Sequence, residues 1–284
     1  KEVSSDLVTG TKIELEIEAL YQKGARSVDD YLKQTAIANP HAYIIYNSPD
    51  NKRAIFSRAT DKLPPQPKEI KPHPYGIEFG VFINMLKDTQ ARTLQSFLTN
   101  DFSRVGPGTA KKICEEAQIK TNFHPSNISR EEAEKLFNII QKTKLIAPST
   151  DCLSPIEAED LQKSLEKEIP AEFFASTTRP ASVYRGNPFQ ITAAIAYGGK
   201  LESDNTIQLL RFANRVPLQY QQSSCAITKS ILETNWHNYG LQQSRGALPI
   251  GPVVIVIHMA SVWVPFTSES KEAIAPYPEI IKEI

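Results

Sequence analysis

One lysine near the end of the chain has the surroundings of a phosphate-binding group. Lys271 follows the apolar stretch 253–264 and the hydroxyl-rich residues 266–270, which places a positive charge on a loop after a predicted strand. A flexible ammonium suits contact with a terminal phosphate because it acts as a compact point charge. Most lysines on such loops are merely solvated, so the pattern alone leaves both interpretations open.

A second candidate is the glycine-containing turn at residues 105–109, which precedes a predicted helix. Exposed backbone amides and a helix N-terminus favour phosphate oxygens, and Thr109 is expected to cap the helix. Glu115 and Glu116 follow within two turns and favour the alternative of a solvated loop. If the turn contacts DNA, the residues involved are Gly106, Gly108, Lys111 and Lys112.

Residues 9–11 place a glycine and two hydroxyls before a predicted strand, where a ligand would approach the backbone. An ordinary strand-entry turn explains the same residues. The chain has no P-loop, GxSxG or HExxH sequence, and its five histidines share no ligand spacing, so no metal site is predicted. Three widely separated cysteines are expected to be reduced, structural thiols.

Composition indicates a globular protein of 284 residues, 40% hydrophobic and 23% charged, with a length that favours two domains over one. The 32 basic residues balance the 32 acidic ones, so any DNA contact must be local. The apolar run 253–257 ends at His258, far short of the roughly 20 residues of a membrane span. The first residues carry no secretion signal, and because the apolar run is so short we also expect no membrane association.

The first part of the chain reads as strand, helix and hairpin. Apolar residues alternate with charged ones over 12–18, which predicts a half-buried strand. Ser27 is positioned to cap a helix that stops at residues 39–40. Residues 42–46 and 53–58, separated by a turn-rich stretch, predict a hairpin, and a proline-rich linker follows to residue 76.

Helical spacing of apolar residues extends from about 81 to 143 and includes a capping box at Ser129 and Glu132. After residue 148 the pattern is mixed, typical of a sheet backed by helices. We expect helices over 154–168 and 226–236, and strands over 191–197, 206–212 and 253–264.

Five stretches, in this order, resemble the family of archaeal DNA topoisomerase VI B subunits. They are residues 71–76, 148–155, 184–189, 211–218 and 270–275, and the resemblance extends from about Thr9 to the end. It implies a multidomain α+β and α/β fold: the end of a GHKL (Bergerat) ATPase sandwich with a linker at 1–76, a small all-helical helix-two-turn-helix domain at 77–148, and an α/β transducer domain at 149–284. The transducer is expected to contain a left-handed βαβ crossover and a C-terminal helix cut at Ile284.

The resemblance also implies the ATP-operated clamp of a type IIB topoisomerase. B subunits would dimerise on ATP and pass one DNA duplex through a break made by A subunits, in a cytoplasmic, nucleoid-associated A2B2 heterotetramer. Lys271 would contact the γ-phosphate, and Thr11 would make a water-mediated contact with adenine. The resemblance implies that the protein requires ATP and magnesium. The family's water-activating and magnesium-binding residues are absent from this sequence and are expected upstream of Lys1. We therefore expect this piece alone to be inactive.

Two alternatives remain. One is a non-catalytic relative that keeps the helical and transducer domains as an interaction scaffold, although retention of Lys271 argues against it. The other is a different GHKL ATPase, of mismatch-repair or gyrase type, which the inserted helical domain fits poorly. Glu157 and Ala158 stand where the family pattern has a glycine-containing turn, so the start of that helix is open.

Overall fold

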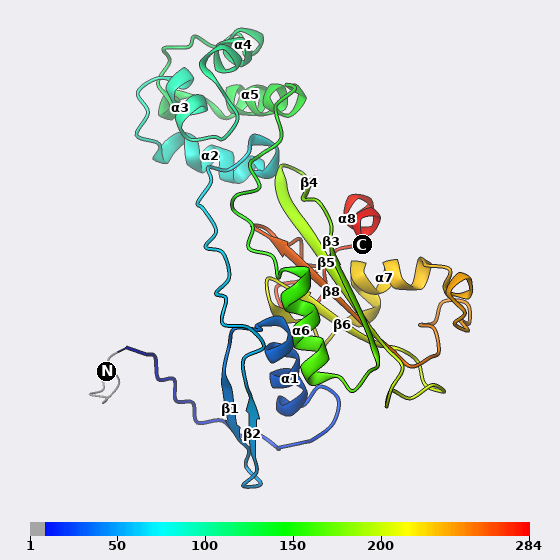
Figure 1. Cartoon of the computed structure of the whole chain (residues 1–284). Coiled ribbons are helices and arrows are strands. Elements are labelled where there is room, and N and C mark those ends of the chain that lie inside the picture. Colours follow the sequence, from blue (N-terminus) through cyan, green and yellow to red (C-terminus); the bar gives the residue numbers. More distant parts are fainter. Residues whose placement is uncertain (1–8) are drawn as a thin grey trace.

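The computed structural model describes residues 9–284, which form three parts (Figure 1). A cluster of helices stands at one end, a mixed sheet with covering helices lies in the middle, and a small hairpin lies at the other end. The chain enters the helical cluster through residues 57–73 and leaves it through residues 143–157. The fold is therefore mixed α/β, with the helical cluster inserted between two α/β pieces.

The central sheet has six strands in the order β3-β5-β8-β6-β7, with β4 pairing beside β5. Only β6 and β8 run parallel, and the other pairs are antiparallel. The strands are β3 (Phe173–Thr178), β4 (Ser182–Tyr184), β5 (Asn187–Tyr197), β6 (Gln208–Ala213), β7 (Val216–Pro217) and β8 (Val253–Ser261).

Strand β8 is buried along its whole length because both faces of the sheet are covered. Val253, Ile255 and Ile257 pack on one face under α7 (Ala226–Glu233) and α8 (Pro278–Glu283). Val254 and Val256 pack on the other face under α6 (Ala158–Glu168) and α1 (Val28–Ala38). Two-sided burial explains why this strand reads as an unbroken apolar run instead of an alternating one.

The connection from β6 to the parallel strand β8 passes through β7 and α7, which makes a βαβ unit. A parallel pair requires such a long crossover because its strands start at the same edge of the sheet. The left-handed sense of the crossover stays a prediction.

The helical cluster consists of α2 (Phe79–Asp88), α3 (Leu94–Asn100), α4 (Pro107–Ala117) and α5 (Arg130–Lys142). Its core centres on Phe82, Phe97 and Phe102, all nearly inaccessible to solvent. The ring centroids of Phe97 and Phe102 lie 5.3 Å apart, edge to face, a favourable aromatic geometry. The predicted helical faces are confirmed by this core.

The predicted capping box is confirmed. The Ser129 hydroxyl accepts from the Glu132 amide at 3.2 Å, and the Glu132 carboxylate accepts from the Ser129 amide at 2.9 Å. The predicted Thr109 cap is wrong, because α4 begins at Pro107 with Gly106 as its N-cap. Proline starts the helix three residues earlier than predicted, since its fixed φ suits the first helical position and it has no amide to satisfy.

The helix and hairpin predicted in the first part are confirmed as α1, β1 (Ile44–Asn47) and β2 (Arg53–Phe56). Ser27 caps α1 by accepting from the Asp30 amide at 3.2 Å. The strand predicted over 12–18 is wrong: these residues pair with no strand in the described part of the chain. Ile13 and Leu15 are each 78% exposed, so no described residue covers the apolar face that the alternation predicts.

Helix α6 begins at Ala158, not at residues 154–155 as the Ser-Pro pair predicts. The carbonyl of Pro155 accepts from Arg215 Nη2 at 2.9 Å, and that of Ile156 accepts from Thr192 Oγ1 at 3.0 Å. Because both carbonyls bond to side chains, one in β5 and one in the turn between β6 and β7, they are directed away from a helical turn. Helix α7 and strand β8 likewise end three residues earlier than predicted, at Glu233 and Ser261.

The base of the helical cluster rests on the tight turn between β4 and β5. Gly186 has φ +72°, and a Cβ atom there would lie 2.8 Å from the Gly76 nitrogen and 2.9 Å from His73 Nδ1. The guanidinium of Arg185 lies 5.4 Å from the ring centre of Tyr277, the N-cap residue of α8. One turn therefore contacts both the cluster and the start of α8.

Burial of His258 in β8 predicts a pH dependence of stability. Its Nε2 accepts from the Arg215 amide at 3.2 Å, and burial together with the Arg215 charge lowers its pKa to about 3. As pH falls below about 6.5, the histidine of the unfolded chain becomes protonated while the buried histidine of the folded chain stays neutral, so the free energy of unfolding decreases. The stability advantage of the wild type over His258→Gln should shrink by about 1.4 kcal/mol per pH unit between pH 6 and 4.5.

Urea unfolding of both proteins at pH 7.5, 6.0, 5.25 and 4.5 measures this difference. The substitution has a constant cost of its own, which is read at pH 7.5 and subtracted. A difference that stays constant across the series would contradict a neutral, buried His258.

Candidate functional site

The Lys271 loop follows β8 and is closed by its own backbone. An isolated antiparallel bridge joins Phe266 to Ile274, and the Thr267 amide donates to the Ala273 carbonyl at 2.9 Å. Ala273 and Ile274 are fully buried in the core under α7 and α8. The buried end anchors the loop, while its tip at residues 267–271 stays exposed.

Lys271 lies at this exposed tip with φ 57°, the left-handed region that non-glycine residues seldom adopt. Its amide donates to the Ser268 carbonyl at 3.1 Å, which closes a tight turn. Within residues 9–284 the ammonium forms no ion pair, and hydroxyls of Thr267, Ser268 and Ser270 lie on the same short loop. The predicted surroundings of Lys271 are present, and the loop offers a cation and hydroxyls to an anion.

A neighbouring loop, residues 218–225, contacts the Lys271 loop through Gln221. The side-chain amide of Gln221 bonds to the hydroxyls of Thr267 and Ser270. Arg211, buried in β6, donates to the carbonyls of Leu218 and Tyr220 at the start of the same loop. Sequence reasoning missed both residues; the one available signal was an arginine inside an otherwise apolar strand.

Thr11 lies apart from this arrangement. It is exposed in the extended segment before α1, and no hydrogen bond in the described part of the chain joins it to the Lys271 loop. The structure therefore does not bring the two predicted nucleotide-contacting residues together.

The glycine turn lies at the start of α4, at the far end of the helical cluster (Figure 1). Neither Gly106 nor Gly108 has a positive φ, and a Cβ atom at either would meet nothing within 4 Å, so neither position requires glycine. The ammonium groups of Lys111 and Lys112 lie 3.8 and 3.7 Å from the carboxylates four residues on. These exposed pairs reduce the local positive charge, and DNA contact here stays a prediction.

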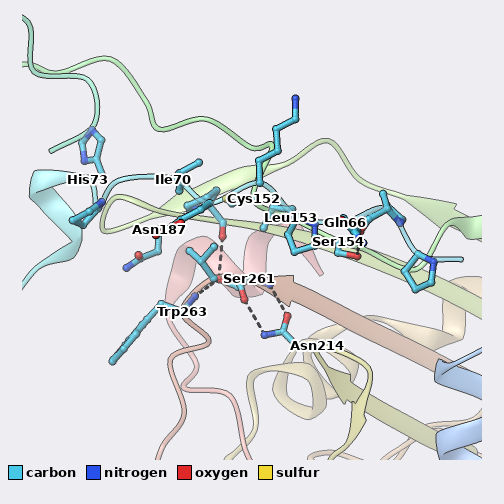
Figure 2. Close-up of a pocket in the computed structure, with 18 of the residues that line it drawn as sticks. Gln66, Ile70, His73, Cys152, Leu153, Ser154, Asn187, Asn214, Ser261 and Trp263 are labelled. Carbon is cyan, nitrogen blue, oxygen red and sulfur yellow. Dashed lines mark hydrogen bonds between the residues drawn. The ribbon is translucent and has the colours of Figure 1, made fainter. Parts of the chain in front are cut away.

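A groove of about 910 Å³ lies between the proline-rich segment 64–73 and one edge of the sheet. Figure 2 shows Asn214 and Ser261 facing each other there, while the Trp263 ring points away from them. Asn214 donates to the Ser261 carbonyl and accepts from the Ser261 amide, both at 2.9 Å. His73 Nε2 lies 3.1 Å from the Ile146 carbonyl, and burial lowers the pKa of His73. Asn214, Ser261 and His73 therefore already have hydrogen-bond partners within the chain.

Other candidate chemistry is limited in the described residues. No group of three or more His, Cys, Asp or Glu side chains could hold a metal there. The three cysteines are free and buried, and desolvation raises the pKa of Cys114 to about 11. A thiol with so high a pKa is a poor nucleophile at neutral pH. Across residues 9–284 we find no helix with the length and apolar character needed to cross a bilayer.

Comparison with known proteins shows which family the chain belongs to. The model of the topoisomerase VI B subunit transducer matches residues 148–284. The type 2 DNA topoisomerase 6 B subunit of Methanococcoides burtonii is 51% identical over 276 residues, 97% of this chain and 44% of that protein. The protein of the same name from Archaeoglobus fulgidus is 46% identical over 98% of this chain and 46% of its own length.

A more distant relative of that name, from Saccharolobus islandicus, is 34% identical over 97% of this chain and 51% of its own length. The chain thus spans about half the length of the curated relatives it matches. Because identity extends across nearly the whole chain and the transducer model matches its second half, the chain belongs to the family of topoisomerase VI B subunits.

Proposed function

We propose that this chain is part of the ATP-operated clamp of a type IIB DNA topoisomerase. In this function two B subunits dimerise on ATP, and a duplex passes through a break that A subunits make in a second duplex. The partners are then the A subunit, a second B subunit and double-stranded DNA. Family membership supports this assignment, and the Lys271 loop is the observation that carries it.

The Lys271 loop has the hydrogen-bond donors that a terminal phosphate requires. An exposed ammonium without an ion pair in the described residues is available to an anion, and three hydroxyls flank it. ATP, when bound, would supply the free energy of hydrolysis and the γ-phosphate that distinguishes it from ADP. Lys271 would hold that phosphate by one charge-assisted contact, while the rest of the nucleotide is held by residues outside this loop.

A contact made in one nucleotide state and lost in the other is what couples a ligand to a conformational equilibrium. Since Ala273 and Ile274 anchor the loop in the transducer core, a change at Lys271 would reach the sheet directly. Thr11 would contribute a water-mediated contact with adenine. Magnesium would be held by residues outside the described part, because residues 9–284 contain no suitable cluster of metal ligands.

A non-catalytic scaffold of the same family is the second candidate. It predicts that an exposed, unpaired lysine in a strained turn has no effect on nucleotide turnover. The Lys271 experiment therefore separates the two functions.

In the complete B subunit assembled with its A subunit, Lys271→Ala should lower DNA-stimulated ATP turnover and plasmid relaxation together, by about tenfold or more. Folding stability should change by less than about 0.5 kcal/mol, because the side chain is exposed and Ala meets the same left-handed backbone. Lys271→Arg should restore little, since a planar guanidinium does not replace a compact ammonium.

The matched control is Lys200→Ala, an exposed lysine in the turn after β5 with no ion pair in the described residues. It should leave both activities unchanged. Wild-type turnover in Lys271→Ala, with normal thermal unfolding, would exclude the clamp role of this loop and favour the scaffold.

We predict that residues 1–284 alone neither hydrolyse ATP nor bind it tightly, because one lysine cannot replace a water-activating carboxylate and a metal ligand set. Phosphate release with magnesium and ATP, compared with a protein-free blank, tests this. Turnover well above the blank that a substitution within the chain abolishes would contradict it.

Any DNA contact at the start of α4 should involve backbone phosphates, without base readout. Replacing both Lys111 and Lys112 by Ala should then weaken binding for all sequences and reduce the salt dependence of the association constant. Replacing Glu115 and Glu116 by Gln should strengthen binding, because it frees both ammonium groups from their ion pairs. An unchanged salt slope in both variants would remove this site from consideration.

A further inference from the structure

Two neighbouring loops each contain a non-glycine residue in the left-handed region of backbone conformation. Gln221 has φ 48° and ψ 39°, and Lys271 has φ 57°. Side chains with a Cβ atom adopt such conformations at a cost and keep them only where the surroundings hold them in place. Strain of this kind gathers at functional sites, so the contact between the two loops is where a further functional residue should be sought.

Gln221 spans the tip of the Lys271 loop with both ends of its side-chain amide. Its Oε1 accepts from the Thr267 hydroxyl at 3.3 Å, and its Nε2 donates to the Ser270 hydroxyl at 3.3 Å. Ser270 precedes Lys271, and its hydroxyl also lies 2.7 Å from the Ser268 hydroxyl. One amide thereby fixes both sides of the turn that carries the lysine.

The loop that carries Gln221 has a rigid base, because Arg211 holds it from inside the sheet. Arg211 is only 2% exposed, and its Nη2 donates to the Leu218 carbonyl at 2.7 Å and to the Tyr220 carbonyl at 2.9 Å. Within residues 9–284 no carboxylate pairs with this buried guanidinium. Burying a charge without a partner of opposite charge costs free energy, which the two hydrogen bonds to carbonyls partly offset. These bonds hold the start of the loop against the sheet.

A second hydrogen bond joins the two segments at Ala226, five residues after Gln221. The amide of Ala226, the first residue of α7, donates to the Ile274 carbonyl at 2.7 Å, and both residues are fully buried. The Lys271 loop is therefore tied to residues 221–226 at its buried end and at its tip. The buried tie supports folding, whereas the tip tie at Gln221 lies at the surface.

We infer that Gln221 is a positioning residue for Lys271: its amide, held by the Arg211-anchored loop, fixes the turn that presents the ammonium. This inference rests on the proposed function of Lys271. Gln221 does not itself need to touch the nucleotide, because its amide acts through the two hydroxyls. The bonds are long and exposed, so they contribute little to folding but decide where the turn lies.

The test uses the complete B subunit assembled with the A subunit. In Gln221→Ala, hydrogen exchange of the amides at 267–273 should become faster by about 3- to 10-fold in the absence of nucleotide. The maximal rate of DNA-stimulated ATP hydrolysis should fall by a similar factor with KM for ATP unchanged, because the lysine is misplaced while the pocket is intact.

Gln222→Ala is the matched control, since the adjacent Gln222 makes no side-chain hydrogen bond in the described residues. Its exchange and turnover should equal those of the wild type. Thr267→Val removes one bond from the opposite loop without altering residue 221 and should show the same two effects as Gln221→Ala. Unchanged exchange in both Gln221→Ala and Thr267→Val would overturn the inference.

A double-mutant cycle separates this inference from the proposed function. If Gln221 acts through Lys271, Gln221→Ala should lower turnover no further once Lys271 is Ala. Full additivity of the two effects would overturn the positioning role while leaving the role of Lys271 intact. Wild-type turnover in Lys271→Ala would instead contradict the proposed function, and the exchange measurement would still decide whether Gln221 holds the loop.

Discussion

Burial of β8 on both faces is the constraint on which the second half of the structure depends. A strand covered on both sides must have neighbours that satisfy its backbone, and β5 and β6 provide them along its length. Because β6 runs parallel to β8, both strands end at the same edge of the sheet. The Lys271 loop leaves from that edge, and Asn214, just after β6, bonds both backbone groups of Ser261 at the end of β8.

The strand also sets where the buried arginine can act. Arg211 in β6 stands opposite Ile257 of β8, on the face covered by α7. From there its guanidinium reaches carbonyls in the loop that precedes α7, and the sheet becomes the fixed base of that loop. The candidate site is thus assembled by neighbouring strands of one sheet, although its side chains lie on surface loops.

Local sequence predicted the elements whose stability is local. The capping box at Ser129, the cap at Ser27 and the hairpin at 44–56 depend on residues a few positions apart, and the structure contains all three. The position of Lys271 on an exposed, hydroxyl-rich loop after an apolar strand was also predictable from one short stretch, while its contact with a phosphate stays a prediction. Residue type and near neighbours carry all of this information.

Features that depend on distant partners could not be predicted. The alternation over 12–18 describes a strand with a covered face, yet no described residue covers it. The start of α6 is decided by Arg215 and Thr192, which lie more than thirty positions away in sequence. Gln221 bonds to Thr267 and Ser270, which lie 46 and 49 positions away in sequence. These contacts exist only once the two loops meet in the fold, so no neighbouring residue in the sequence predicts them.

The turn between β4 and β5 contacts both the helical cluster and the start of α8. Gly186 fits against Gly76 without room for a single methyl group, while its neighbour Arg185 lies over the ring of Tyr277. A rigid body held at its base behaves as a lever, so a sub-ångström shift of this turn becomes a larger excursion at the distant tip of α4. Because the same turn contacts Tyr277, the N-cap residue of α8, a tilt of the cluster about this turn would also disturb the start of α8.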